Sequence, residues 1–451
     1  MEDRSLKRTI SLWGAIAIII GYVVGASIFI LPGKLAYTAG PGLFISFLVA
    51  SVFAMFVCII GAQVGSALPI SGANYVIVSR TISPFAGFMY FWTTMVTISV
   101  GVPVIAYGFA NYLSFFLPGI NPMLSAVLII LFCMIINIIG VNIASSIQAF
   151  LVVEFIIVLL IFGIGGLIDM DRSNFVPLFP NGIPIVLLTA IPAGFSFTGF
   201  NIITALGDEI KDPSRNIPLS ILISFLSVVF IYMIVTIAVP GLLPWQTLSG
   251  VEAPIAVASG KFLPGWFANI IALSALAAAL TSVNGVLMGQ ARDCFAIAKD
   301  NILPAHFALI SKKFKSPHVA ILFVTSLTII GVLFGTTIED YAVLTVIGFT
   351  ILKCLLSVAT IRLPKKLPEH YAQAPFKLGN FQRIFSASAL IVIAILFMLA
   401  GSSHNIMSTM IFFIFLFVGC VYYKLRKHML LKKNIQLDEF LKKSLNHQST
   451  R

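Results

Sequence analysis

The sequence predicts an all-α integral membrane protein that crosses the bilayer twelve times. Hydrophobic residues make up 59% of the 451 residues and charged residues only 10%, with a mean hydropathy of +1.05. A soluble chain carries about a quarter charged residues. Apolar runs of about 20 residues, the length of a transmembrane helix, recur along the whole chain. The twelve expected spans cover residues 12–36, 42–67, 85–115, 122–140, 147–168, 184–206, 217–240, 266–296, 318–335, 340–362, 384–400 and 406–425.

The spans belong to one transmembrane domain, residues 1–425, because no Pro/Ser-rich linker divides them. In the basic tail at 426–451, leucines among lysines predict either an amphipathic helix on the inner membrane surface or a frayed, solvated tail. The outer loop at 241–265 is expected to hold a short helix, and residues 363–383 to form a basic loop. The five cysteines show no metal or disulfide spacing, so no metal or cofactor is expected.

The net charge of +12 follows the expected topology. With twelve spans, both termini share one side of the membrane. That side carries 24 Lys and Arg residues, against three on the other: Lys34, Arg172 and Lys261. Basic residues gather on the cytoplasmic side of membrane proteins. We therefore expect a cell-membrane protein with both termini in the cytoplasm, and no nucleic-acid partner.

Small residues and proline interrupt two of the spans. The first span contains Gly21, Gly25, Ala26 and Ser27. The sixth contains Pro192, Gly194, Ser196, Thr198 and Gly199. Lipid cannot satisfy the backbone groups that such residues free, so this backbone must be buried in protein or line a cavity. Interrupted helices at corresponding places in two halves of a chain point to the binding site of a transporter.

Each break lies in the first span of a block of five. The blocks cover residues 12–168 and 184–362, and residues 384–425 add two more spans. Because five is odd, the second block is expected to be inverted relative to the first. A five-plus-five inverted repeat with broken leading helices is typical of carriers that work by alternating access.

Three stretches resemble the amino acid–polyamine–organocation permeases. GASIF at 25–29 resembles the family's G-[SA]-G-I-F signature. SFTGF at 196–200, leading into DEIKDPSRNIP at 208–218, resembles its sixth span and E-E-x-K-N-P-x-R-N-x-P exit. AR at 291–292 with AIAKDNILP at 296–304 is close to its A-R-x-x-x-A-M-A-R-D-G-x-L-P. A weaker match is GSALPISGANY at 65–75, and the resemblance covers roughly residues 10–365.

This resemblance implies a leucine-transporter-like fold and a bacterial-type amino acid transporter. It also implies that Phe195 is an aromatic gate over the substrate. Three positions depart from the family pattern: Ser27 and Asn301 stand where glycine is usual, and Gln63 where glutamate is common. Asparagine suits a left-handed helix end, so Asn301 is expected to keep that geometry.

The first break is expected to bind a carboxylate. A helix that restarts after an unwound stretch presents free N–H groups and a partial positive charge. Gly25, Ala26 and Ser27 would supply these groups, between Gly21 and Ile28. The alternative is that Gly21 and Gly25 form a G-x-x-x-G surface for helix packing.

The second break is expected to bind an ammonium group through carbonyls between Phe195 and Gly199, Ser196 included. The two breaks together would then hold the zwitterion common to amino acids. The candidate walls are Phe195, Phe197, Thr198, Phe200 and Asn201; core or lipid packing is the alternative for Phe197 and Phe200. Because this break contains no acidic residue, a neutral amino acid is favoured over arginine, lysine or polyamines.

Glu154 and Lys353 are the charged residues expected inside the spans, away from helix ends. Each costs about 2.5–3.5 kcal/mol at mid-membrane, so both are coupling candidates. Glu154 is expected either to carry a proton or to form a structural hydrogen bond or an ion pair with Lys353.

Two further sets of candidate residues, both suggested by the resemblance, complete the predicted site. Thr281 and Ser282 are candidates for a sodium site with carbonyls of the first span, although helical hydroxyls often bond to their own backbone. A cytoplasmic latch is expected from Asp208, Glu209, Lys211, Asp212, Arg215 and Arg292, with ordinary loop solvation as the alternative.

Other classes of protein fit less well. The six histidines lie in loops or the tail without metal-ligand spacing, which argues against an enzyme. No filter repeat or charge ring indicates a channel. A transporter-like nutrient sensor stays open, as does the choice between proton symport and exchange.

Overall fold

The computed structural model describes residues 8–25, 27–251, 253–334, 338–402, 406–433, 435–437 and 441. Within these ranges the regular structure is helical, with two isolated β-bridges, Ile10–Ile210 and Ser71–Leu206. The α-helices are α1 (Leu12–Val24), α2 (Ser27–Ala39), α3 (Leu43–Ala67), α4 (Ala73–Thr81), α5 (Pro84–Phe116), α6 (Pro122–Ile139), α7 (Val141–Asp169), α8 (Ile183–Phe195), α9 (Pro213–Leu242), α10 (Pro254–Ser259), α11 (Phe267–Lys299), α12 (His318–Leu333), α13 (Ile338–Lys366), α14 (Pro368–Gln373), α15 (Asn380–Ser402) and α16 (Ile406–Lys432). The 3-10 helices are η1 (Gly40–Gly42), η2 (Arg172–Phe175), η3 (Phe200–Ala205), η4 (Gly207–Glu209), η5 (Trp245–Leu248) and η6 (Ala305–Ala308).

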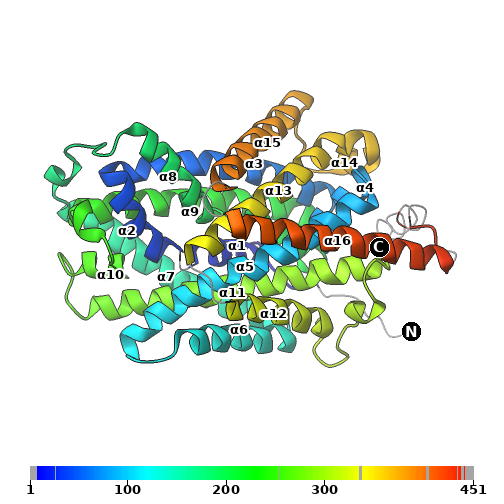
Figure 1. Cartoon of the computed structure of the whole chain (residues 1–451), viewed down its shortest axis with the longest axis horizontal. Helices are drawn as coiled ribbons and strands as arrows, with labels where there is room; N and C mark the ends of the chain where they lie inside the picture. Colours follow the sequence, from blue (N-terminus) through cyan, green and yellow to red (C-terminus); the bar gives the residue numbers. More distant parts are fainter. Residues whose placement is uncertain are drawn as a thin grey trace.

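Most of the long helices run along the longest axis of the molecule (Figure 1). α2, α8 and α10 lie at one end, and α4, α14 and the C-terminal end of α16 lie at the other. In the described ranges, nine helical runs are long and apolar enough to cross a membrane. η5 and α10 confirm the short helix expected within residues 241–265. The count of twelve spans and the inverted repeat stay predictions.

Both interrupted spans are broken. α1 ends at Val24 and α2 begins at Ser27, with Gly25 at φ +45° between them. α8 ends at Phe195, and the chain turns at Gly199, φ +117°, before η3 begins. Glycine adopts these backbone conformations at no steric cost, so the two glycines suit the places where the helices stop.

Small residues on α11 bring α1 and η3 close to it. A Cβ on Gly285 would stand 3.1 Å from the Tyr22 Cβ, and one on Gly289 would stand 2.1 Å from Ile202 Cδ1. Small side chains let membrane helices approach closely. Because α1 also packs against α7 and α9, the first break is enclosed by other helices.

The C-terminal helix α16 holds the loop that follows α11. Asn301 has φ +62°, which confirms the left-handed geometry expected there. Arg426 donates from Nη2 to the Asn301 carbonyl, 2.9 Å, and from Nε to the Ile302 carbonyl, 3.1 Å. α16 continues to Lys432, past the expected start of the tail at residue 426. Residues 434, 438–440 and 442–451 of that tail lie outside the described residues.

Candidate binding site between the helix breaks

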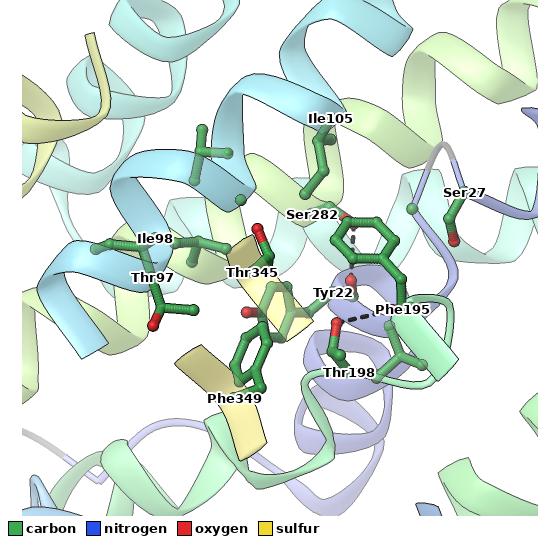
Figure 2. Close-up of a pocket in the computed structure, with 15 residues that line it drawn as sticks. Tyr22, Ser27, Thr97, Ile98, Ile105, Phe195, Thr198, Ser282, Thr345 and Phe349 are labelled. Carbon is green, nitrogen blue, oxygen red and sulfur yellow. Dashed lines mark hydrogen bonds between the residues drawn. The ribbon is translucent and has the colours of Figure 1, made fainter. Parts of the chain in front are cut away.

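A cavity lies where the two breaks meet α5, α11 and α13 (Figure 2). About 30 Å³ of it is open to the centre of a water molecule, which is room for a few waters. Figure 2 shows the rings of Tyr22, Phe195 and Phe349 around it. The lining residues are all uncharged: Tyr22, Val23, Gly25, Ser27, Thr97, Ile98, Gly101, Val102, Ile105, Phe195, Thr198, Ser282, Val286, Thr345 and Phe349.

The first break reaches the cavity through Gly25 and Ser27. A Cβ on Gly25 would stand 2.4 Å from Ser282 Oγ, so space as well as φ requires glycine there. Ser27 Oγ donates to the Val24 carbonyl, 3.0 Å. This bond satisfies one of the carbonyls left without an intrahelical partner where α1 ends. Ala26 lies outside the described residues.

The second break contributes Phe195 and Thr198 to the cavity. Thr198 Oγ1 donates to the Phe195 carbonyl, 2.8 Å. Gly199 lies against the ring of Tyr22, where a Cβ would come within 2.5 Å. Since Tyr22 belongs to α1, the two breaks are in direct contact.

Tyr232 of α9 connects the same two breaks. Its buried hydroxyl lies 2.9 Å from the Ser196 carbonyl and 3.2 Å from the Val23 carbonyl. A phenol carries a single hydrogen, so the two carbonyls share one donor. Tyr232 therefore fixes the spacing between the backbone of the first break and that of the second.

The sodium candidates bond directly to the first span. Thr281 Oγ1 lies 3.0 Å from the Gly21 carbonyl, and Ser282 Oγ lies 2.8 Å from the Tyr22 carbonyl. Thr281 also lies 2.8 Å from the Ala278 carbonyl of its own helix, the position that helical hydroxyls often take. Among the described residues, no three His, Cys, Asp or Glu side chains form a group suited to a metal ion.

Several residues predicted for the site lie outside the cavity lining. They are Gly21, Ile28, Ser196, Phe197, Gly199 and Asn201. Phe197 packs against Phe47 and Tyr232, which is the core contact that the alternative describes.

Phe200 and Asn201 also face away from the cavity. Phe200 packs against Phe225 of α9. Asn201 lies against α3, where a Cβ on Gly61 would stand 2.1 Å from its Oδ1. The chain continues here as the 3-10 helix η3, and its tighter turn changes which side chains face the cavity.

Sequence reasoning missed the walls that α5 and α13 provide. Thr97, Gly101 and Ile105 are spaced by four residues on α5, and Thr345 and Phe349 likewise on α13. That spacing places side chains on one helical face. This spacing of four residues is the signal available in the sequence, but many helix faces in such an apolar chain show the same spacing.

Neither coupling candidate lines the cavity. Glu154 Oε1 accepts a hydrogen bond from Ser274 Oγ of α11, 2.5 Å, and its side chain is partly exposed. Lys353 is buried, with Nζ 5.9 Å from the centroid of the Phe349 ring. Among the described residues the partner of Glu154 is thus Ser274, and no ion pair with Lys353 is formed in this conformation.

One pair of the expected latch is formed. Arg292 Nε donates to Glu209 Oε1, 2.7 Å, and both side chains are almost fully buried. The pair joins η4, which follows the second break, to α11. The Lys211 and Arg215 side chains are exposed, as the loop-solvation alternative predicted for them.

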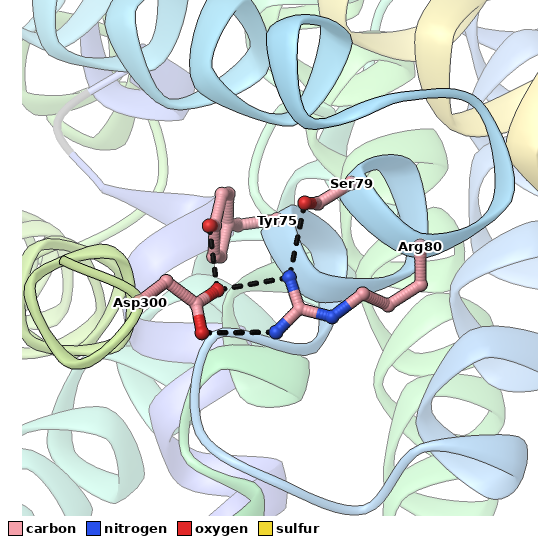
Figure 3. A network of polar contacts seen from close by, with 4 residues as sticks. All are labelled: Tyr75, Ser79, Arg80 and Asp300. Atoms are coloured by element: carbon pink, nitrogen blue, oxygen red, sulfur yellow. Dashed lines mark hydrogen bonds and ion pairs between the residues drawn. The ribbon is translucent and has the colours of Figure 1, made fainter. Parts of the chain in front are cut away.

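A second buried network, which the sequence did not reveal, joins α4 to the residue after α11 (Figure 3). Arg80 Nη2 donates to Asp300 Oδ1, 2.9 Å, and the Tyr75 hydroxyl donates to Asp300 Oδ2, 2.6 Å. Arg80 also bonds to Ser79 Oγ, 3.0 Å. Burial, and next the nearby Asp300 carboxylate, raise the pKa of the Tyr75 phenol well above its usual value, so Tyr75 stays a donor.

The apolar helices and the cavity at two broken spans define a multi-pass membrane protein of the transporter class. Residues 10–420 match the profile of the amino acid permease family, and the chain belongs to that family. This confirms the resemblance to amino acid–polyamine–organocation permeases.

Three relatives are each 28% identical to the chain over the aligned residues. The branched-chain amino acid permease of Bacillus subtilis (strain 168) is 28% identical over 388 residues, 81% of this chain and 83% of the relative. The methylthioribose transporter of the same organism is 28% identical over 454 residues, 96% of each chain. The Asc-type amino acid transporter 1 of Mus musculus is 28% identical over 364 residues, 74% of this chain and 67% of the relative. All three carry the names of transporters.

Proposed function

We propose that the protein moves neutral amino acids across the cytoplasmic membrane by alternating access. The observation that carries this proposal is the uncharged cavity at the meeting point of the two breaks. The helices that contain the breaks rock against the rest of the bundle around this cavity. Both termini face the cytoplasm in the proposed orientation.

Backbone groups at the breaks hold the zwitterion. The carboxylate binds N–H groups where α2 begins at Ser27, because a helix N-terminus attracts anions. The ammonium group donates to carbonyls between Phe195 and Gly199. Hydrogen bonds from Thr198 and Tyr232 already reach the Phe195 and Ser196 carbonyls. The Phe195 carbonyl also accepts from the Thr198 N–H, 3.1 Å. A carbonyl has two lone pairs, so the Ser196 carbonyl keeps one with which to accept from the substrate.

The side-chain end of the cavity suits an aliphatic group. Val23, Ile98, Val102, Ile105 and Val286 are apolar walls, and each buried methylene is worth about 0.8 kcal/mol. A cationic side chain would meet no carboxylate in this lining and would be buried without a partner, which is unfavourable. The name of the branched-chain amino acid permease among the relatives supports the same substrate class.

Transport is driven by proton symport or by exchange, without sodium. The hydroxyls of Thr281 and Ser282 act as hydrogen-bond donors that hold the first break. Glu154 serves as a structural partner of Ser274. The Glu209–Arg292 pair closes the cytoplasmic side and separates when the cavity opens inward.

A second candidate substrate is methylthioribose. The relative with that name covers 96% of both chains. A thioether sugar has no zwitterion, so it would place its methylthio group against the aliphatic walls. Its hydroxyls would bond to side chains such as Thr97, Thr345 and Tyr22, which line the cavity.

Counterflow in proteoliposomes tests the two candidates together. Vesicles are loaded with unlabelled leucine, arginine or methylthioribose, and entry of the labelled compound is followed in sodium-free buffer. We expect exchange of leucine and none of arginine. Exchange of methylthioribose alone would replace the amino acid proposal, and exchange of arginine but not leucine would refute it.

A further inference from the structure

Asp293 of α11 is a buried carboxyl group that belongs neither to the latch pair nor to the cavity lining. Its residue is 4% exposed, and its Oδ1 has no hydrogen-bond partner. It lies beside Gly72, on which a Cβ would stand 3.5 Å from Oδ1. The adjacent Arg292 does not neutralise it, because that guanidinium donates to Glu209 at 2.7 Å and to the Met288 carbonyl at 2.9 Å.

Other buried oxygens nearby in the sequence and the fold also lack a donor. Gln290 lies three residues earlier on α11, and Asn74 two residues after Gly72. The Gln290 Oε1 and Asn74 Oδ1 atoms are buried without a partner. An ionised carboxylate gains nothing from such acceptors, and burying it unpaired is strongly unfavourable. A proton on Asp293 would remove the charge and supply a donor.

We propose that Asp293 is the proton-binding residue of this transporter, holding a proton on its carboxyl group in the conformation of the structure. The proton leaves to water when α11 separates from η4: the carboxylic O–H bond breaks, and a carboxylate and a hydronium ion result. This inference rests on the transport function proposed above and assigns its driving ion to one side chain.

The position of Asp293 suits such a role because it lies next to the latch on α11, a helix that also lines the cavity through Ser282 and Val286. Its neighbour in the chain is Arg292 of the latch pair. Tyr90 of α5 is buried and lies in the neighbourhood of both Asp293 and Tyr22. Tyr22 lines the cavity. In this proposal, separation of the latch pair exposes the neighbouring Asp293 to water, on the helix that also lines the substrate site.

No neighbouring charge compensates a negative charge on the Asp293 carboxyl group, so burial favours the neutral, protonated form. The elements around it carry, among other titratable and charged groups, Tyr90 on α5, Tyr22 on α1, Glu209 on η4, Arg292, Cys294 and Lys299 on α11, and Tyr75 and Arg80 on α4. Glu209 and Arg292 neutralise each other, and Arg80 is paired with Asp300. No cation among the described residues is paired with Asp293. Glu154 differs, since it is partly exposed and bonded to Ser274.

The test uses the full-length protein and the variant Asp293→Asn, with Glu154→Gln as the matched control. Asparagine resembles the protonated acid in size and charge. Infrared spectra of wild type labelled with ¹³C-aspartate should show the C=O band of a protonated carboxyl group at neutral pH. Asp293→Asn should lack that band, and Glu154→Gln should keep it. A wild-type spectrum containing only carboxylate bands for aspartate would overturn the proposal without any variant or substrate.

Transport measurements form the second part of this test. A pH difference of one unit drives up to about tenfold accumulation of a substrate coupled to one proton. Wild type and Glu154→Gln should accumulate labelled leucine under an acid-outside gradient. Asp293→Asn should show no accumulation but normal leucine counterflow at equal pH, because exchange needs no net proton movement.

Two results of the transport measurements would contradict the assignment. One is gradient-driven accumulation by Asp293→Asn, and the other is loss of counterflow in a variant that still binds leucine. Removal of the carboxyl band by sodium would show that an alkali cation occupies the site instead. Absence of all transport in wild type, with the infrared band present, would refute the proposed function but not the protonation of Asp293.

Discussion

The guanidinium of Arg292 and the carboxylate of Glu209 lie 2.7 Å apart, at a point where neither side chain meets appreciable solvent. The pair ties the chain after the second break to α11, the helix whose hydroxyls at Thr281 and Ser282 bond to the first break. One helix therefore contacts both breaks and the latch. A movement of α11 relative to η4 would be transmitted to the cavity.

Removing one partner of this pair should destabilise the protein. Glu209→Gln leaves the Arg292 charge buried without its counter-ion, at a cost of about 3–5 kcal/mol. We expect a clear fall in the thermal unfolding temperature of the purified protein. Lys211→Gln, at an exposed position two residues away, is the control and should unfold like wild type. An unchanged unfolding temperature in Glu209→Gln would show that the Glu209–Arg292 pair does not stabilise the protein.

Gly25→Ala should abolish transport. The new Cβ would stand 2.4 Å from Ser282 Oγ, and the residue would keep φ +45°, which costs about 1–2 kcal/mol for a side chain other than glycine. Gly250→Ala is the matched control, because Gly250 has φ +72° but no atom within 4 Å of the new Cβ. Leucine counterflow should be lost in the first variant and kept in the second. Equal leucine counterflow in the two variants would show that the first break does not require glycine at position 25 for steric reasons.

Tyr232→Phe should weaken the connection between the two breaks. It removes the hydroxyl shared by the Ser196 and Val23 carbonyls, a loss of about 1 kcal/mol in stability. We expect leucine exchange to fall further than in Tyr107→Phe, which loses a comparable bond to the Val332 carbonyl away from the cavity. Equal exchange rates in the two variants would mean that the spacing of the breaks does not depend on Tyr232.

Ser282→Ala should reduce transport without altering its response to sodium. The hydroxyl bonds to the Gly21 and Tyr22 carbonyls, and its loss frees the end of α1. Ser220→Ala is the control, since that buried hydroxyl bonds to the Ile217 carbonyl of its own helix. Uptake is measured in sodium and in choline buffer. Sodium stimulation of wild type that Ser282→Ala lacks would instead make Ser282 a sodium ligand.

Asp300→Asn should destabilise the network at the end of α11. The change leaves the Arg80 charge buried without a carboxylate, at about 3–5 kcal/mol. Asp212→Asn is the control, because Asp212 is exposed and has φ +44°, which asparagine also tolerates. Thermal unfolding of the two variants gives the comparison. A larger fall in the unfolding temperature of Asp212→Asn than of Asp300→Asn would contradict the stabilising role of the Arg80–Asp300 pair.

The sequence predicted the breaks because their chemistry is local. Gly25 and Gly199 both have positive φ, and Ser27 and Thr198, which reach the cavity, lie within two residues of them. Gln63, an expected departure from the family pattern, is explained by a contact that glutamate would not reproduce. Its amide accepts from the Leu378 N–H and donates to the Phe376 carbonyl.

The rest of the site depends on packing between distant segments. Thr97 and Thr345 meet at the cavity from α5 and α13, and Arg80 meets Asp300 across 220 positions of sequence. No local pattern encodes such pairings. Asn201 lies outside the cavity lining for a related reason: the chain after the second break continues as a 3-10 helix, so α-helical spacing no longer gives the direction of its side chain.

A structure of the protein with bound leucine would test the central claim most directly. We expect the leucine carboxylate at the N–H groups that begin α2, near Ser27, and its ammonium group at the carbonyls between Phe195 and Gly199. The aliphatic side chain should point toward Ile98 and Val286. Leucine bound away from both breaks, or bound with its carboxylate on a charged side chain, would contradict the account.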